Sequence, residues 1–266
     1  MILKQSLFIC PICGNKMFDL GTTLRCMLGH SFDKSKEGYV NLLLKNASGK
    51  RHGDDKLMVA ARKSFLDKGF YATLRENIAE ALGTDKTVLD SGCGEGYYTS
   101  RFADSNKVLG IDISKDALKY AAKRCPNVDF AVASVGQIPL ADGSVDAVLN
   151  IFAPDSPTEF YRVLKADGRL IIVQPMENHL FELKAAIYDN PYKNPPLELQ
   201  KTGFTLCATK EVKYKIALES NEDILSLFKM TPYYYKTSKS DQEKLNDIDS
   251  LTVSLEFLIT VYDKNM

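Results

Sequence analysis

The 266-residue sequence lacks an excess of either charge, since Lys and Arg together number 34 and Asp and Glu also number 34. A chain without net charge has no global positive field to attract nucleic acid, so RNA or DNA binding would have to come from a local patch. No apolar run approaches the roughly 18–20 residues that span a membrane, and the first residues lack the pattern of a secretory signal. We therefore expect neither a membrane partner nor a leader peptide.

Cysteine and histidine are scarce, at six and three residues. Three of the cysteines, Cys93, Cys125 and Cys207, are scattered along the chain, which is not a disulfide framework and favours a reducing, cytoplasmic location. A hydrophobic content of 45% and a charged content of 26% are those of an ordinary globular protein. The length allows one substantial domain and one small one.

The other three cysteines lie near the start with a histidine, as Cys10-x2-Cys13 and, after twelve residues, Cys26-x3-His30. Two short chelating loops about a dozen residues apart are typical of a tetrahedral zinc site. The alternatives are a redox Cys-x-x-Cys pair or unrelated thiols, but a redox motif is expected between a strand and a helix, without a second Cys/His pair downstream. No coordination position is left open, so we predict one structural Zn²⁺ in a module of residues 1–35, which is too small to fold by burial alone.

The segment after this module has a modest basic excess. Residues 31–63 carry eight positive and four negative side chains, a difference of four. Lys50 and Arg51 belong to the stretch 46–53, whose Asn, Ser and Gly residues predict a loop. The excess indicates either a solvated linker or a patch that contacts phosphates beside the zinc module.

A linker and two helices are expected at residues 36–82, where Asp54 caps the first helix. The remaining residues, 83–266, alternate between apolar strands and helices and end with two long β-rich runs. This alternation predicts an α/β domain with a mostly parallel sheet that helices cover on both faces. The expected strands are 87–90, 107–112, 128–132, 145–151, 169–173, 204–217 and 251–262, and the expected helices are 54–68, 73–82, 97–103, 114–123 and 158–164.

A glycine-rich loop and an acidic residue follow the first two of these strands, namely Gly92-Cys-Gly-Glu-Gly96 and Asp112. In parallel sheets, ligands bind at the carboxyl ends of the strands, where such a loop lets the backbone approach a ligand and such an acid accepts hydrogen bonds from ribose hydroxyls. The dinucleotide fingerprint would require glycine in place of Tyr97, and the Gly-Lys-Ser/Thr of a P-loop is absent. The pattern therefore predicts a nucleoside ligand of another kind.

Asp90-Ser-Gly-Cys-Gly-Glu-Gly96, with the acid after the second strand, resembles the motifs of class I S-adenosylmethionine-dependent methyltransferases. The stretch 133–148 is similar to the segment that lines the adenine in those enzymes, where Ser134 and Gln137 either contact the cofactor or are turn residues. The resemblance implies a Rossmann-like sheet of seven strands, the last two antiparallel, and S-adenosylmethionine (SAM) as cofactor. The contacts implied by these motifs are Gly92, Gly94, Glu95, Gly96, Asp112 and Ser134.

A second resemblance covers nearly the whole chain. The zinc cluster, residues 32–43, 62–71 and 90–99, and Met230-Thr-Pro232 occur in an order that resembles the bacterial 23S rRNA (guanine-N1)-methyltransferase family. This resemblance implies methyl transfer from SAM to N1 of one guanine in hairpin 35 of 23S rRNA. One branch of the family confers resistance to tylosin-type macrolides, and the resemblance also suggests a homodimer.

The same resemblance implies roles for individual residues. Without it, Tyr71 would be interpreted as a core residue at a helix end and His179 as a surface cap. The zinc ligands that it implies are Cys10, Cys13, Cys26 and His30, in agreement with their spacing, and the cofactor contacts are Tyr71, Gly94, Glu95 and His179.

Other stretches stay without an assigned role. The stretch 150–157, with Asp155, varies in the family, so no catalytic base is assigned. Asp189-Asn-Pro-Tyr192 is similar to the Asn-Pro-Pro-Tyr signature of enzymes that methylate exocyclic amines, but it lacks one proline and follows the fifth strand, so we expect a loop. The tyrosines of 231–236 are expected either to stack on a splayed base or to pack under the last strands.

Two other functions share part of this pattern. A methyltransferase for a small metabolite would have the same core and would not need a metal-bound, basic appendage. A non-enzymatic, zinc-containing RNA-binding protein would keep the zinc module and lose cofactor binding, which the glycine loop and Asp112 argue against. The predicted function is therefore that of an rRNA methyltransferase with SAM, one structural Zn²⁺ and 23S rRNA as partner.

Overall fold

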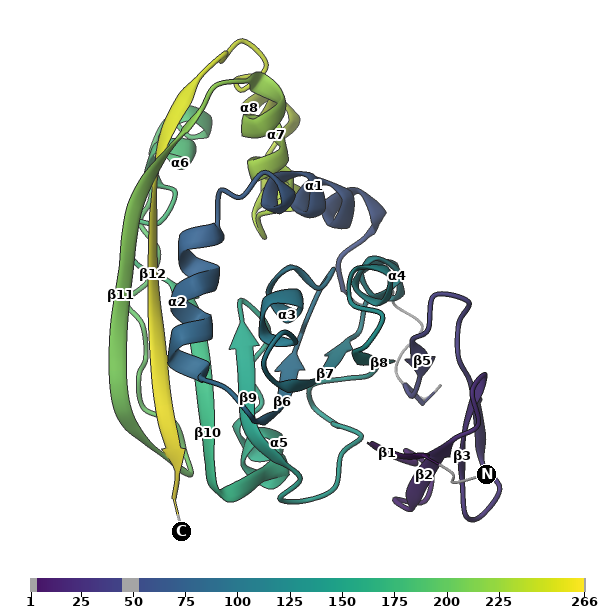
Figure 1. Ribbon diagram of the computed structural model, residues 1–266. Helices are drawn as coiled ribbons and strands as arrows, with labels where there is room; N and C mark the ends of the chain where they lie inside the picture. The colour runs from purple at the N-terminus through teal and green to yellow at the C-terminus, as the bar shows by residue number, and fades with distance from the viewer. Residues whose placement is uncertain (1–3, 45–52, 266) are drawn as a thin grey trace.

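The computed structural model describes residues 4–44 and 53–265. Most of the loop expected at 46–53, with Lys50 and Arg51, lies outside these residues, so the phosphate-contacting patch there stays a prediction. Figure 1 shows a long central sheet, helices packed on it, a small N-terminal sheet to one side and a group of helices above the tips of the parallel strands. Within the described ranges, no helix combines the length and the apolar character needed to cross a membrane.

The central sheet contains β5 (Val40–Asn41), β6 (Thr87–Ser91), β7 (Lys107–Asp112), β8 (Asp129–Val132), β9 (Val145–Ile151), β10 (Leu164–Pro175), β11 (Phe204–Leu218) and β12 (Leu251–Lys264). Their order is β11-β12-β10-β9-β6-β7-β8-β5. Strands β6 to β10 are parallel, whereas β12 and β11 continue the sheet antiparallel. These seven strands are the ones that the sequence predicts. β5, from the segment expected as a linker, adds an eighth strand parallel to β8.

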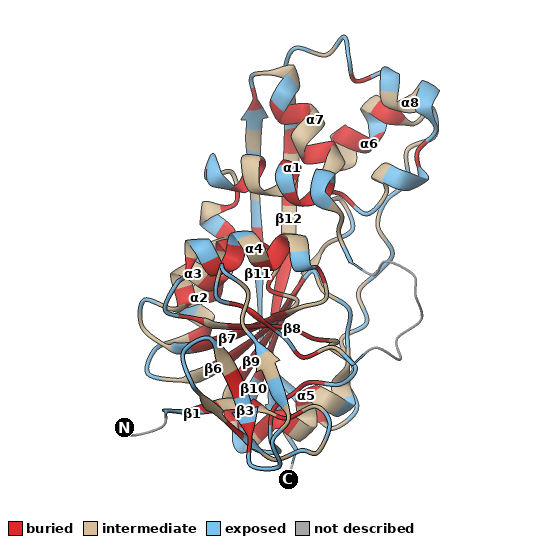
Figure 2. Cartoon of the chain, turned by 90° about the vertical axis from the view of Figure 1, so that its right-hand side faces the viewer, coloured by how far each residue is buried: buried red, intermediate tan, exposed pale blue. Residues whose placement is uncertain are grey.

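The central parallel strands are buried on both faces, as Figure 2 shows by the buried residues along them, whereas the edge strand β11 is largely exposed. On one face, Val88 and Leu149 share a core with α2 (Ala72–Leu82), α3 (Tyr97–Phe102) and α4 (Lys115–Arg124). On the other face, Leu89 and Leu109 share a core with α5 (Pro157–Val163) and the N-terminal module. Neighbouring residues of a strand point to opposite faces, so a strand buried on both sides needs the near-continuous apolar runs that the sequence has here.

The N-terminal module is an antiparallel sheet of β1 (Lys4–Ile9), β2 (Lys16–Asp19), β3 (Thr23–Cys26) and β4 (Ser31–Asp33). It docks on the segment before β9, where the backbone N–H of Ile9 donates to Pro139 O at 2.9 Å. Phe8 and Met17 pack in the same cluster as Leu140 of the large domain. Module and sheet thus share one core, and the domain boundaries at residues 35 and 82 stay predictions.

Three further helices, α1 (Lys56–Asp67), α7 (Asn221–Lys229) and α8 (Lys239–Glu243), lie above the carboxyl ends of the parallel strands, and α6 (Phe181–Ile187) lies beside β12. The helices after residue 180 are absent from the sequence prediction. The cap of α1 is Asp55, whose Oδ1 accepts from the backbone N–H of Leu57 at 2.9 Å. The assignment of this cap to Asp54 was wrong, because Asp54 binds an arginine described below.

The structure also shows where the two tyrosine-containing segments lie. Residues 189–192 lie outside helices and strands, which confirms the expected loop. Tyr233 and Tyr234 pack against Phe228 of α7, in the core cluster that also contains Val253 and Leu255 of β12.

We predict that Gly110→Ala will destabilise the fold through overpacking at the centre of β7. A Cβ at Gly110 would lie 2.5 Å from two ring carbons of Phe130 and 2.9 Å from Cys93 Sγ. We expect a loss of about 1–3 kcal/mol in the free energy of unfolding, measured by urea titration. The control is Gly136→Ala, whose Cβ would come no closer than 3.5 Å to Ser134 Oγ and should change stability by less than about 0.5 kcal/mol. Equal stability of the two variants would contradict the packing argument.

Candidate active site and metal centre

The glycine loop after β6 is shaped by what packs against it. All three of its glycines have positive φ, of 81° at Gly92, 55° at Gly94 and 81° at Gly96. A Cβ at Gly92 would lie 2.4 Å from Ala153 Cβ, and one at Gly96 would lie 3.0 Å from Ala121 Cα. By contrast, a Cβ at Gly94 would meet only Arg62 Nη1, at 3.9 Å. The outer glycines therefore permit close packing, and the middle one leaves room for a ligand to approach the backbone.

Asp112, at the end of β7, is fixed against this loop. Its Oδ2 accepts from the backbone N–H of Gly94 at 2.9 Å, and its Oδ1 accepts from the backbone N–H of Ser114 at 2.7 Å. Burial raises the pKa of Asp112, although these two N–H donors lower it. Each carboxylate oxygen keeps a second lone pair, which is the capacity that ribose hydroxyls would use. The structure thus brings together Gly94 and Asp112, as the sequence predicts.

Two more buried carboxyl groups lie in the same region. Glu95 follows Gly94 in the loop and is buried, which raises the pKa of its carboxyl group. Asp90, at the end of β6, accepts from Thr99 Oγ1 at 2.6 Å, and burial raises its pKa to about 7 with help from the charges of Asp112 and Glu95. Such a concentration of buried acids requires compensation by a cation.

Arg62 of α1 supplies that cation. Its guanidinium pairs with Asp54 and lies next to Gly94. Burial lowers the pKa of Arg62, but the carboxylates of Asp54, Glu95 and Asp112 outweigh this effect and raise it. Ser114 Oγ donates to Asp54 O at 2.8 Å, which ties the start of α1 to the segment after β7. In the sequence, Arg62 belongs only to the basic excess and to the 62–71 motif, and neither feature indicates its place beside the glycine loop.

Tyr71 and His179 come together around Phe257 of β12. Tyr71 is buried at the start of α2 with its ring centroid 5.2 Å from that of Phe257, and the ring centroid of His179 lies 4.6 Å from the same ring. Burial lowers the pKa of His179 to about 3, and the charge of Lys184 adds to this effect. His179 Nδ1 accepts from the backbone N–H of Glu256 at 3.2 Å. The imidazole is therefore neutral with its proton on Nε2, which makes Nε2 a hydrogen-bond donor.

Unpartnered buried hydroxyls support a polar ligand at this place. Among the described residues, Ser91 Oγ and Tyr98 Oη are buried without a hydrogen-bond partner. Ser91 directly precedes Gly92, and Tyr98 lies in α3 at the end of the glycine loop. Buried polar groups nearly always have a hydrogen-bond partner. Two buried hydroxyls without a partner beside a glycine loop therefore fit a ligand with polar groups, such as SAM.

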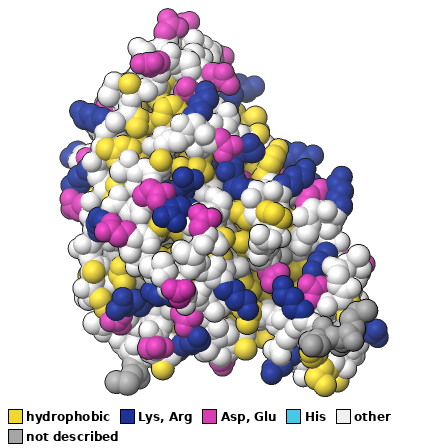
Figure 3. Space-filling view, in the orientation of Figure 1, with side chains coloured by type: hydrophobic (Ala, Val, Ile, Leu, Met, Phe, Trp, Pro, Cys, Tyr) yellow, Lys and Arg dark blue, Asp and Glu magenta, His cyan; other side chains and the backbone are white. Residues whose placement is uncertain are grey.

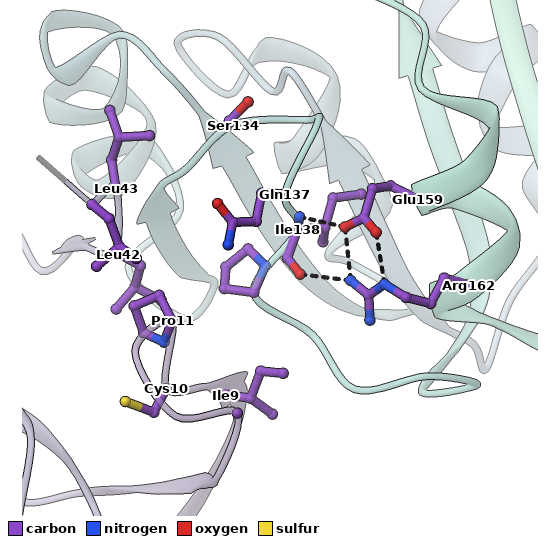
Figure 4. A pocket seen from close by; sticks show the side chains of 13 residues that line it. Ile9, Cys10, Pro11, Leu42, Leu43, Ser134, Gln137, Ile138, Glu159 and Arg162 are labelled. Atoms are coloured by element: carbon purple, nitrogen blue, oxygen red, sulfur yellow. Dashed lines mark hydrogen bonds and ion pairs between the residues drawn. The ribbon is translucent and has the colours of Figure 1, made fainter. Parts of the chain in front are cut away.

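Ser134 lies to one side of this group. Ala133 donates its backbone N–H to Asp112 O at 3.1 Å, but the Ser134 hydroxyl accepts from the backbone N–H of Gly136 at 3.1 Å, as in a turn. Figure 4 shows Ser134 and Gln137 on a cavity of about 270 Å³ between the N-terminal module and the large domain. Arg162 at its edge is held by Glu159 and by the carbonyl of Ile138. The turn geometry is therefore observed, and cofactor contact by Ser134 stays a prediction.

The four predicted zinc ligands cluster in the N-terminal module, on the side where Cys10 and Cys26 join the core shared with the large domain. Their ligand atoms all lie within 4.8 Å of one another. Cys13 Sγ lies 3.8 Å from Cys26 Sγ, and His30 Nδ1 lies 3.5 Å from Cys10 Sγ and 3.4 Å from Cys26 Sγ. A tetrahedral Zn²⁺ with bonds of about 2.3 Å to sulfur places two sulfurs about 3.8 Å apart. Three thiols and an imidazole at these separations fit one Zn²⁺ with all four positions filled by protein.

Comparisons with known proteins agree with this architecture. Residues 82–231 match a family described as a methyltransferase domain, and residues 8–46 match the zinc-ribbon family described as "RlmA, N-terminal". Two solved structures share the fold at 16% identity: the [4+2]-cyclase SpnF, with a TM-score of 0.54 over 79% of this chain and 94% of that one, and the YcgJ protein from Bacillus subtilis, with 0.50 over 74% and 99%. The fold is that of class I methyltransferases, as the sequence predicts.

Similar sequences carry more specific names. The chain is 34% identical to "Putative 23S rRNA (guanine-N(1)-)-methyltransferase YxjB" of Bacillus subtilis over 96% of both chains. It is 40% identical to "23S rRNA (guanine(748)-N(1))-methyltransferase" of Streptomyces fradiae over 67% of this chain and 66% of that one. With a zinc ribbon, a methyltransferase domain and a relative matched from end to end, this chain belongs to the 23S rRNA (guanine-N1)-methyltransferase family.

Proposed function

We propose that this protein transfers the methyl group of SAM to N1 of one guanine in hairpin 35 of 23S rRNA. The observation that carries the proposal is the space over Gly94, bordered by Asp112 and Arg62, in a chain that also has a four-ligand zinc ribbon. The first feature suits a nucleoside cofactor, and the second suits an enzyme that must select a site in a large RNA. The names of the relatives support N1 of a guanine in 23S rRNA as the methyl acceptor.

Different residues around the glycine loop bind different polar groups of the cofactor. When bound, SAM supplies a methyl group on a positively charged sulfur. Asp112 accepts hydrogen bonds from the ribose, and Arg62 pairs with the carboxylate of the amino-acid end, since it is the cation beside Gly94. Glu95 adds negative charge for the ammonium group, and Nε2–H of His179 donates on the side of β12. Gly92 and Gly96 hold the loop in shape.

The nucleophile is a ring nitrogen that carries a proton in neutral guanine, so a base or water must accept that proton during transfer. Asp90, with a pKa raised to about 7, has the proton affinity of a general base. It is nevertheless fully buried behind the glycine loop and accepts from Thr99, so it cannot reach a substrate. N1 also lies on the Watson–Crick edge, and the target guanine must therefore leave any base pair before reaction. The chain's main contribution is positioning of the two reactants.

The zinc ribbon gives the enzyme a second surface for RNA. Figure 3 shows basic and acidic side chains interspersed over the face in view. Because the chain has as many basic as acidic residues, we expect shape and local contacts to select the RNA. The tips of the two metal-binding loops expose apolar side chains, Ile12 in the first and Met27 and Leu28 in the second, with Met27 74% exposed. These tips are stiffened by the metal and are suited to contact unpaired bases. Macrolide resistance, a homodimer and a cytoplasmic location, which the family resemblance suggests, stay predictions.

The function is tested by mapping methylated nucleotides. Purified protein, SAM and unmodified 23S rRNA transcript should yield a single N1-methylguanine in hairpin 35, detected by mass spectrometry of RNA fragments. Asp112→Ala should abolish the product, because the ribose contact is lost. Methylation at another base, or methylation of a small metabolite with none of the rRNA, would contradict the proposal.

Removal of zinc should unfold the N-terminal module first. We expect one Zn²⁺ per chain by elemental analysis, because four ligands converge on one point. A strong chelator should expose the segment 4–33 to proteolysis while the calorimetric affinity for SAM changes little, since the glycine loop lies in the other part of the chain. Cys26→Ser should act like the chelator, and Cys207→Ser, on exposed β11, is the matched control. Full protease resistance of the metal-free module would contradict a structural metal.

His179 should bind SAM as a neutral donor over the range from pH 5.5 to 7.5. Because burial lowers its pKa to about 3, protonation of His179 should add no step near 6.5 to the pH dependence of the dissociation constant for SAM, so the wild type and His179→Gln should have the same pH profile. His179→Gln keeps an acceptor for Glu256 N–H and an N–H donor and should bind SAM nearly as well, whereas His179→Leu should lose up to about tenfold, the net value of one hydrogen bond.

The depressed pKa of His179 also makes the stability of the fold depend on pH. Below pH 6.5 the imidazole takes up a proton in the unfolded chain but not in the folded one, so the free energy of unfolding falls as the pH is lowered from 6.5 towards 3. His179→Gln should make this decline shallower in urea titrations at pH 7 and pH 5. An unchanged decline in the variant, or a step near pH 6.5 in SAM binding that is present in the wild type and absent from His179→Gln, would show that His179 titrates normally.

A further inference from the structure

Phe152, in the loop after β9, has a backbone conformation that its side chain disfavours. Its φ is +56°, in the left-handed region, where a bulky residue is rare. The other described non-glycine residues with positive φ are Asp85 and Leu180. The ring of Phe152 is 44% exposed, so burial of an apolar side chain does not account for its presence. A strained, exposed aromatic residue at the carboxyl end of a central strand calls for a functional explanation.

The surrounding structure holds this conformation in place. Asn150 is buried at the end of β9, and its Nδ2 donates to Pro154 O at 2.8 Å while its Oδ1 accepts from the backbone N–H of Ala153 at 3.3 Å. The backbone N–H of Phe152 donates to Val173 O at 3.2 Å. On the other side, the loop presses against Gly92, which has no room for a Cβ beside Ala153. The chain therefore directs the Phe152 ring outward through contacts on both sides of the residue.

The ring stands beside the groups proposed to contact the cofactor. Its centroid lies 5.5 Å from that of Phe257 and 6.4 Å from that of Tyr98. Phe257 is the ring that Tyr71 and His179 both contact. Phe152 thus forms the exposed end of an aromatic group whose buried end consists of these residues. Its neighbour in the loop, Ala153, touches the glycine loop directly.

Two other exposed aromatic side chains, Tyr192 and Tyr235, have polar or charged partners within the chain. The Tyr235 hydroxyl binds Asp55, and the Tyr192 ring covers the buried Lys184, whose Nζ lies 4.5 Å from its centroid. Phe152 carries no polar atom, and its contacts with Phe257 and Tyr98 leave nearly half of its surface in solvent. This exposed part of the ring is available for contact with a substrate.

We propose that Phe152 is the platform on which the target guanine stacks once it has left its helix. The proposal rests on the function proposed above. A guanine that presents N1 to a methyl group loses its stacking on neighbouring bases, and an aromatic ring at the reaction site restores part of it in any base without reading the sequence. A flat contact on one side of the base also restricts its plane, which aligns N1 with the methyl–sulfur bond.

The test compares Phe152→Leu with Phe152→Tyr. Leucine keeps an apolar side chain but removes the ring, and tyrosine keeps the ring. We expect kcat/KM for hairpin RNA to fall by roughly 5- to 150-fold in Phe152→Leu, the range for loss of one base–aromatic stack, and to stay within about threefold of the wild type in Phe152→Tyr. The calorimetric dissociation constant for SAM should be the same in all three proteins. Phe152→Asn, which tolerates the left-handed backbone, is a second ring-less variant and should behave like Phe152→Leu.

A direct readout uses RNA with 2-aminopurine in place of the target guanine. The fluorescence should be more strongly quenched on binding the wild type and Phe152→Tyr than on binding the two ring-less variants, because the ring stacks on the extruded base. Equal quenching and equal kcat/KM in all four proteins would overturn the proposal, as would loss of SAM affinity in both ring-less variants, which would indicate a merely structural role. A wild type that binds SAM but does not methylate the RNA would overturn the proposed function itself, and the platform with it.

Discussion

The close packing of three backbone segments around residues 92–96 determines the rest of the site. The loop after β9 leaves no room for a side chain at Gly92, and α4 leaves none at Gly96, so the chain between them must bend over Gly94. Asp112 then holds the N–H of Gly94 and couples the end of β7 to the end of β6. Because these strands are neighbours in the parallel sheet, the ligand-binding groups come together without any long loop. Arg62 reaches Gly94 from α1, so its position depends on the bend of this loop.

The N-terminal module depends on the same sheet, although a metal holds its two ligand loops. Its apolar residues Phe8 and Met17 lie in the core of the large domain, where they cover the face that α5 leaves free. Two of the zinc ligands, Cys10 and Cys26, lie in this same shared core, so metal binding and apolar burial stabilise the same part of the module. The metal-binding loops are thereby firmly joined to the large domain.

The sequence predicted the parts that depend on short-range pattern. The strand–helix alternation, the seven strands, the glycine loop with Asp112 and the convergence of the zinc cluster were all readable, because each is encoded within a few residues or by a regular period. The place of Arg62 was not, since it depends on how α1 docks over Gly94. His179 meets the backbone of Glu256 only because β12 returns antiparallel beside β10, which no local pattern reveals. Helix α7 was not predicted, although Ser220 as its cap and the acidic residues in its first turn are local signals for a helix. The left-handed Phe152 follows from the Asn150 contacts and could not be predicted.

The buried carboxyl groups around Arg62 have a consequence for turnover. Asp54, Glu95 and Asp112 lie around the guanidinium of Arg62, and Asp90 is buried close to Glu95 and Asp112, so these four carboxyl groups outnumber the guanidinium groups of Arg62 and Arg124 that act on them. SAM carries one more positive charge than S-adenosylhomocysteine, the thioether left behind when the methyl group departs. The proposed cofactor site would therefore attract the donor more strongly than the spent cofactor, because the charge that favoured entry disappears in the reaction itself. Release of the by-product would be favoured by the same acids that draw the donor in.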